Sequence, residues 1–356
     1  MKILFITTKI TDSGGVSAIL IKKINALLAF KNIEIAIAST NDDVTNLFFK
    51  LDQRVQVFYM KTKMRSILDL NRFKNEFREV VATFQPDLIS VTDNGLKSFF
   101  IKRFLIDNIP TIYEVHANEQ SFFYGESKGI KAKLHHFILQ RLLKTFDCVV
   151  YQKHQFKLPK NVAKKIFIPN FIKLTPQNQS VNINKFIAVG RIVSTKNYVG
   201  LLRIWKKIQT NFPDKELHVY GSWDESDLVN SLKNIPGIYL HKPTTNLNEI
   251  FSEAYALLHS SMFESFPMVF LEAMSYGVPV VCYNINQPDL VVNQSTGFVI
   301  TSNDEAMFIE KTEALILDVK LRKKFSEQGL LHVENFSQDK IIQQWFDLFN
   351  SYKLLK

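Results

Sequence analysis

The chain has 356 residues, a hydrophobic fraction of 46% and a mean hydropathy of −0.03, values typical of a soluble globular protein with two α/β domains. No run of about 18 apolar residues predicts a membrane-spanning helix, and the first residues predict a buried strand rather than a secretory signal. Two cysteines, Cys148 and Cys282, lie in apolar strand-like stretches, which favours core thiols in a reducing cytosol over a disulfide or a metal site.

The net charge of +10 is unevenly distributed along the chain. Residues 1–184 hold 27 basic and 15 acidic side chains, a balance of +12, whereas residues 185–356 hold 17 and 19, a balance of −2. A basic half indicates an anionic partner, such as an anionic membrane surface, a polyanionic glycan or a nucleic acid. Because no nucleic-acid-binding motif accompanies the charge, we expect no nucleic acid. A solvated lysine-rich surface is the alternative interpretation.

The first half of the chain alternates predicted strands with predicted helices. This alternation favours a parallel, doubly wound sheet. A polar, Pro-containing segment at 174–184 is typical of an interdomain linker. The expected strands are 2–8, 33–39, 88–91, 111–115 and 148–152, and the expected helices are 16–28, 66–84, 95–107 and 134–145.

The same alternation starts again after the linker and predicts a second parallel sheet. Its expected strands are 186–190, 217–220, 256–260 and 278–283, and its expected helices are 198–209, 247–254, 304–317 and 319–333. A last amphipathic helix is expected at 339–354.

The most informative segment is a loop, a short helix and a buried strand that follow one another between residues 263 and 283. Pro267 suits the first turn of a helix, and Gly277 suits its end. The free N–H groups at this helix start, near Met268 and Val269, form a site for an anion. Glu264 and Glu272 flank the helix start and offer two hydrogen-bond acceptors.

Cations and glycines follow other predicted strands. Arg191 and Lys196 come after the strand 186–190, where ligands of open α/β sheets bind, and together they can grip a diphosphate. Gly14 and Gly15 lie at the first strand-to-helix junction, where the backbone can approach a bound group. They do not form Gly-x-Gly-x-x-Gly, so a dinucleotide cofactor is disfavoured.

His116 follows the predicted strand 111–115 and can donate a hydrogen bond to a ligand there, or be a loop histidine without a role. A surface position is the alternative for each of the charged residues taken alone.

Together these segments resemble the signature of retaining glycosyltransferases of family 4. The strongest match is Glu264-Ser-Phe266-Pro267, three apolar residues, Glu272-Ala-Met and Gly277-Val-Pro-Val, with Ser265 where the family usually has glycine. The resemblance implies the α/β fold called GT-B, with two Rossmann-like doubly wound domains facing across a cleft. It implies an acceptor domain at 1–176, a donor domain at 185–338, and a helix at 339–356 that packs back on the first domain.

The resemblance also implies roles for residues. His116, Arg191, Lys196 and Glu264 would be catalytic. The donor sugar nucleotide, a substrate and not a cofactor, would be bound without a metal ion. The implied substrate-binding residues are Gly14, Gly15, Arg191, Lys196, Glu264, Phe266, Pro267, Met268, Val269 and Glu272.

We therefore expect a glycosyltransferase that moves a hexose or N-acetylhexosamine from a nucleotide sugar, UDP-linked, onto a bacterial surface glycan or lipid-linked acceptor. We expect it in the cytoplasm, peripheral on the inner membrane face. Departures from the family pattern are Gly221-Ser222-Trp223, His241 in place of a frequent glycine, and residues 286–289. A catalytically inactive GT-B protein that binds glycan or lipid, or a sugar-nucleotide epimerase, are the alternatives.

Overall fold

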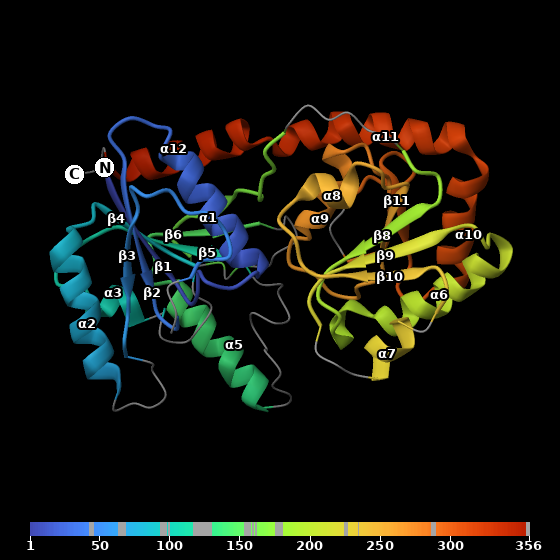
Figure 1. Ribbon diagram of the computed structural model, residues 1–356. Helices are drawn as coiled ribbons and strands as arrows, with labels where there is room; N and C mark the ends of the chain where they lie inside the picture. Colours follow the sequence, from blue (N-terminus) through green and yellow to red (C-terminus); the bar gives the residue numbers. More distant parts are fainter. Residues whose placement is uncertain are drawn as a thin grey trace. The chain divides into compact units, whose positions relative to one another are not determined.

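The computed structural model describes residues 1–42, 46–62, 69–92, 98, 100–116, 130–152, 158, 160, 162–174, 181–223, 227–233, 235–285 and 290–353. The chain forms two compact units. The first comprises Met1–Asn170 and Asp339–Lys356, and the second Phe171–Gln338. Each unit is a parallel sheet with helices packed on it (Figure 1). The family departure at 286–289 lies outside the described residues.

The first unit has a seven-stranded parallel sheet in the order β3-β2-β1-β4-β5-β6-β7. Its first strand lies inside the sheet, and the apolar residues 3–6 of that strand are buried, as is typical of parallel sheets. The strands are β1 (Lys2–Thr7), β2 (Glu34–Ser39), β3 (Gln56–Tyr59), β4 (Leu88–Val91), β5 (Thr111–Val115), β6 (Cys148–Tyr151) and β7 (Lys165–Phe167), and the helices are α1 (Gly15–Leu27), α2 (Asp69–Phe84), α3 (Ile101–Phe104), α5 (Ile130–Leu143) and α12 (Gln338–Lys353).

The second unit repeats the design with six parallel strands in the order β10-β9-β8-β11-β12-β13. Again the first strand in sequence lies inside the sheet. The strands are β8 (Lys185–Val189), β9 (Glu216–Tyr220), β10 (Ile238–His241), β11 (Ala256–His259), β12 (Val280–Tyr283) and β13 (Gly297–Ile300), and the helices are η2 (Ser194–Lys196), α6 (Tyr198–Asn211), α7 (Asp227–Lys233), α8 (Leu247–Phe251), α9 (Met268–Ser275), α10 (Glu305–Leu317), α11 (Val319–Val333) and η3 (Glu334–Phe336).

Helix α12, drawn in red in Figure 1, completes the first unit although it follows the second in sequence. Its apolar side chains pack on the start of the chain: Phe346 stacks on Phe30 with ring centroids 4.0 Å apart, and the Phe349 ring is 6.2 Å from that of Phe5. The Tyr352 hydroxyl donates to the backbone carbonyl of Asp147 over 3.2 Å. The fold of the first unit therefore depends on residues from both ends of the chain.

The predicted fold class, parallel doubly wound α/β sheets, is confirmed. Four strands, β3, β7, β10 and β13, were not predicted. They lie at the edges of their sheets and are only three or four residues long. Of the expected helix at 95–107, the structure describes α3, and residues 93–97 and 99 lie outside the described part of the chain.

Candidate active site

Helix α9 begins and ends where the sequence predicted. Pro267 precedes its first residue, and the Phe270 N–H donates to the Pro267 carbonyl over 3.1 Å. Gly277 has a φ of +64°, in the left-handed region that favours glycine. The Val278 N–H turns back to the Ala273 carbonyl over 3.0 Å and closes the helix end. The first N–H groups of α9 therefore point along its axis from a fixed start.

Glu264 lies beside this helix start and is held by two cationic or polar partners. The Lys196 ammonium donates to Glu264 Oε1, and His259 Nε2 lies 3.1 Å from the same oxygen. Burial alone would raise the pKa of Glu264, but the hydrogen bond from His259 and the charges of His259 and Lys196 outweigh it and lower the pKa to about 2. Glu264 is thus ionised at neutral pH, and its charge is balanced within the second unit.

His259 is a candidate site residue that was not predicted from the sequence. It is the last residue of β11, and its ring meets the edge of Phe270 in α9 at 4.8 Å between centroids. The signal was its place at the carboxyl end of a central strand, five residues before Glu264.

The loop that carries Arg191 and Lys196 is fixed by its neighbours. Gly190 has a φ of +148°, and its N–H donates to the Tyr220 carbonyl over 2.9 Å. A Cβ built on Gly221 would lie 2.0 Å from the Gly190 carbonyl oxygen, so only glycine fits there. The Arg191 side chain is exposed, and Lys196 is half-buried in η2. The two cations therefore differ in freedom: Lys196 is paired with Glu264, and Arg191 faces solvent.

Other predicted residues of the second unit lie on or before α9. Val269 is buried, Met268 and Glu272 are partly exposed, and Phe266 packs its ring against Phe336 at 6.4 Å between centroids. Phe266 thus packs within its own unit, and its substrate-binding role stays a prediction.

Gly14 and Gly15 begin α1 in the first unit. Asp12 holds this turn, since its Oδ1 accepts from the Gly14 N–H over 3.0 Å and from the Ser17 hydroxyl over 2.6 Å. A Cβ built on Gly15 meets no described atom within 4 Å, which leaves room for a ligand at the helix start. Asp12 was not predicted as a site residue.

His116 follows β5 and is buried, with 8% of its surface exposed. Its Nε2 lies 3.0 Å from Glu114 Oε2, and its Nδ1 lies 3.0 Å from Gln152 Nε2. Both ring nitrogens therefore have protein partners. His116, Gly14 and Gly15 belong to the first unit, whereas Lys196 and Glu264 are brought into direct contact in the second.

His241, which replaces a family glycine, belongs to an aromatic stack. Its ring lies 4.3 Å from that of Tyr220, and its Nε2 is 2.9 Å from His218 Nδ1. Burial and the charges of His218 and Lys185 lower the pKa of His241. The end of β10 therefore carries an imidazole where the family pattern has only backbone.

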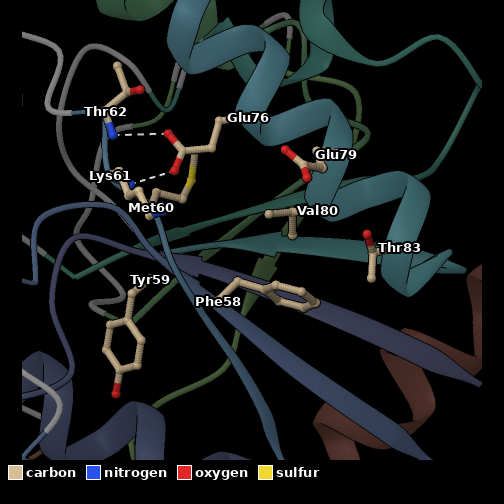
Figure 2. Close-up of a pocket in the computed structure, with 9 residues that line it drawn as sticks. All are labelled: Phe58, Tyr59, Met60, Lys61, Thr62, Glu76, Glu79, Val80 and Thr83. Carbon is tan, nitrogen blue, oxygen red and sulfur yellow. Dashed lines mark hydrogen bonds between the residues drawn. The ribbon is translucent and has the colours of Figure 1, made fainter.

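A separate pocket of about 440 Å³ lies between α2 and the edge strand β3 (Figure 2). Glu76 at its rim accepts hydrogen bonds from the backbone N–H groups of Lys61 and Thr62. Phe58 and Val80 contribute apolar walls. None of its lining residues is a predicted site residue.

Residues 173–332 match the family described as glycosyl transferases group 1. An uncharacterized glycosyltransferase of Haemophilus influenzae is 25% identical and covers 97% of this chain and 98% of its own. The amylovoran biosynthesis glycosyltransferase AmsD of Erwinia amylovora is 21% identical, and the match covers 98% of this chain and 99% of AmsD.

Solved structures match over nearly the full length. Sucrose-phosphate synthase from Thermosynechococcus elongatus has a TM-score of 0.83 and 16% identity over 100% of both chains. A TarM variant from S. aureus, in complex with Fondaparinux, alpha-GlcNAc-glycerol and UDP, has a TM-score of 0.78 and a sequence identity of 13%. The match covers 98% of this chain and 99% of the TarM chain. Anabaena HepE, in complex with UDP and glucose, has a TM-score of 0.74 and a sequence identity of 18%. The match covers 99% of this chain and 100% of the HepE chain. At these identities the likeness shows the fold alone.

Proposed function

Because this chain is a group 1 glycosyltransferase with the GT-B fold, we propose that it transfers a hexose or N-acetylhexosamine from a UDP-linked nucleotide sugar to a bacterial surface glycan or lipid-linked acceptor, with retention at the anomeric carbon. The observation that carries the proposal is the contact of Lys196 and His259 with Glu264 beside the start of α9. UDP is present in the TarM and HepE structures, which supports a UDP-linked donor.

The donor diphosphate would be bound by positive groups of the second unit. The N–H groups of Met268 and Val269 at the start of α9 would face the phosphate oxygens. The exposed Arg191 guanidinium would add a bidentate contact. Lys196 is held by Glu264, and the same ammonium can turn to a diphosphate, which carries more charge than one carboxylate.

This arrangement suits the chemistry of the reaction. Breaking the bond between the sugar and the diphosphate places negative charge on the leaving oxygen, and preorganised cations and N–H groups lower the barrier to that step. Arg191, Lys196 and the α9 start supply such charge, so we propose a reaction that needs no metal ion.

The sugar and ribose would be recognised by acceptors and donors of fixed geometry. When Lys196 turns to the diphosphate, Glu264 becomes able to accept a hydrogen bond from a sugar hydroxyl, with His259 still holding its carboxylate. Glu272, partly exposed on α9, would accept from ribose hydroxyls. From the first unit, Gly14 and Gly15 would let the backbone approach a phosphate, and His116 would contact a sugar hydroxyl.

The names of relatives support the proposed acceptor class. Glycosyltransferases of amylovoran biosynthesis and capsular polysaccharide biosynthesis are among them. Among the described helices, none is long and apolar enough to cross a membrane. We propose a cytoplasmic enzyme that meets its acceptor at the inner membrane face through its basic first half.

A panel of nucleotide sugars tests this function. The chain is incubated with UDP-, GDP- and ADP-linked hexoses and with UDP-N-acetylhexosamines, and the release of nucleoside diphosphate is followed by ³¹P NMR, with and without EDTA. We expect UDP release that persists in EDTA. Exclusive use of GDP- or ADP-sugars would refute the donor class, and loss of activity in EDTA with recovery in Mn²⁺ would refute the metal-free reaction. Accumulation of an epimeric nucleotide sugar would favour the epimerase alternative.

A further inference from the structure

His116 contacts a buried ion pair. The ammonium of Lys23, in α1, donates to Glu114 Oε2 in β5, and the two side chains are 3% and 0% exposed. The other carboxylate oxygen, Oε1, accepts from the Ser90 hydroxyl over 2.6 Å. Burying two charges is costly, so a pair of this kind is retained only where its surroundings stabilise it.

Aromatic rings supply part of that stabilisation. The Lys23 ammonium lies 4.0 Å from the ring centroid of Trp345 in α12 and 5.2 Å from that of Phe5. The face of an aromatic ring attracts a cation, most strongly when water is excluded. Helix α12 thereby covers the Lys23–Glu114 pair.

The hydrogen bonds around His116 determine where its proton lies. Burial acts to raise the pKa of Glu114, but the charge of Lys23 and the hydrogen bond from His116 outweigh it and bring the pKa to about 2. An ionised carboxylate can only accept, so His116 Nε2 must carry a hydrogen and donate it to Glu114 over 3.0 Å. Nδ1 then accepts from the Gln152 amide, also over 3.0 Å.

The two bonds of the ring differ in strength. The bond from Nε2 to Glu114 is charge-assisted, whereas the bond between Nδ1 and Gln152 joins two neutral groups and is weaker. Nδ1 is thus the nitrogen that can exchange its partner for a ligand. Burial lowers the pKa of Lys23, and the charge of Glu114 opposes that shift. Paired with Lys23 in this way, the carboxylate has a counter-ion that does not come from the ring.

We propose that Lys23 and Glu114 are positioning residues that fix His116 as the singly protonated Nε2–H form, so that Nδ1 accepts a hydrogen bond from a hydroxyl of the sugar substrate. The inference rests on the proposed function for the identity of the ligand, and it replaces the sequence-based expectation that His116 donates. Trp345 and Ser90 stabilise the Lys23–Glu114 pair. The Gln152 amide is hydrogen-bonded to Nδ1, and the sugar hydroxyl would replace it there.

The test uses full-length protein with ¹⁵N-labelled histidine, in which the His116 signals are identified by their loss in His116→Gln. We expect the Nε2–H pattern in the wild type. In Lys23→Met, Glu114 takes His116 as its counter-ion, so the ring becomes doubly protonated and kcat falls by about tenfold or more, with a smaller change in KM. The matched control Lys31→Met, at an exposed lysine just after α1, should leave spectrum and kcat unchanged.

The double variant Lys23→Met/Glu114→Gln restores a neutral pair in which the new amide oxygen still accepts from Nε2. It should return the ring to the Nε2–H form and recover most of kcat. If Lys23→Met does not fold, Gln152→Glu gives the same reading, because a carboxylate facing Nδ1 should draw a second proton onto the ring.

The outcomes separate this inference from the proposed function. An Nδ1–H pattern in the wild type, an unchanged ring in both Lys23→Met and Gln152→Glu, or a double variant no better than Lys23→Met would overturn the inference. If the ring responds as expected but His116→Gln keeps full kcat, the assigned contact with the sugar is wrong, while the fixing of the ring by Lys23 and Glu114 stands.

Discussion

Replacing Lys196 by alanine should show how much the charge of this side chain contributes to catalysis and how much it contributes to stability. A Coulomb contact between an ammonium and a phosphate oxygen at about 4 Å amounts to about 4 kcal/mol at an effective dielectric constant of 20. The Lys196 side chain is 23% exposed, so water entering the shortened site would compensate part of that energy. We expect a loss of about 2.7 kcal/mol, a fall in kcat by a factor of about 100.

Glu264, which is 13% exposed, has two described partners, Lys196 and His259. The same substitution removes Lys196 and leaves His259. We expect a loss of about 1–3 kcal/mol in the free energy of unfolding for a partly buried acceptor that has lost its cation. Glu264→Gln added to Lys196→Ala should recover stability but not kcat.

Two measurements decide between these roles: the initial rate of UDP release at saturating donor, and thermal unfolding. Lys320→Ala, at an exposed lysine of α11, is the matched control and should change neither. A kcat for Lys196→Ala within about twofold of the wild type, together with a lowered Tm, would refute the reasoning on catalysis and leave Lys196 as a structural partner of Glu264.

Four further outcomes are expected. Glu272→Gln should raise the donor KM in steady-state assays with little change in kcat, and an unchanged KM would exclude the ribose contact. Gly277→Ala should lower the free energy of unfolding by about 1 kcal/mol, because φ is +64°, whereas Gly15→Ala, which meets open space, should not destabilise the chain. The pKa of Glu264 is lowered from 4.5 to about 2, so its contribution of about 3 kcal/mol is present above pH 4.5 and lost as the pH falls towards 2; urea titrations should show a shallower pH dependence for Glu264→Gln. The protein should sediment with anionic vesicles more than with neutral ones and be released by salt; equal sedimentation would leave the basic half as a solvated surface.

Local signals in the sequence were enough to predict the central strands and helix α9. Proline and glycine mark the ends of that helix through restrictions on single residues, which do not depend on the rest of the fold. The edge strand β3 could not be predicted in this way. It is a partly exposed four-residue segment whose pairing partner, β2, is defined only once the sheet has formed.

Single residues of the candidate site were predicted from the sequence, but the contacts between them were not. Glu264 stood out in sequence, yet its partner Lys196 is 68 residues away, and His259 was part of an apolar strand. Glu114 likewise occupies the middle of a buried strand, where its pairing with Lys23, 91 residues earlier, gave no local signal. Periodicity identifies elements, whereas long-range polar contacts depend on how the elements pack.

The discontinuity of the first unit has a consequence for biosynthesis. Its sheet emerges from the ribosome early, but α12, which brings Trp345 to Lys23, is made only after the 168 residues from Phe171 to Gln338. Synthesis proceeds at about 5–20 residues per second, so the nascent first unit lacks α12 for on the order of 10–30 s. During that time Lys23 and Glu114 are not yet covered by Trp345. The second unit, by contrast, is contiguous and can finish folding as it is synthesised. A chain truncated after residue 338 should therefore be protease-resistant in its second unit and cleavable in its first.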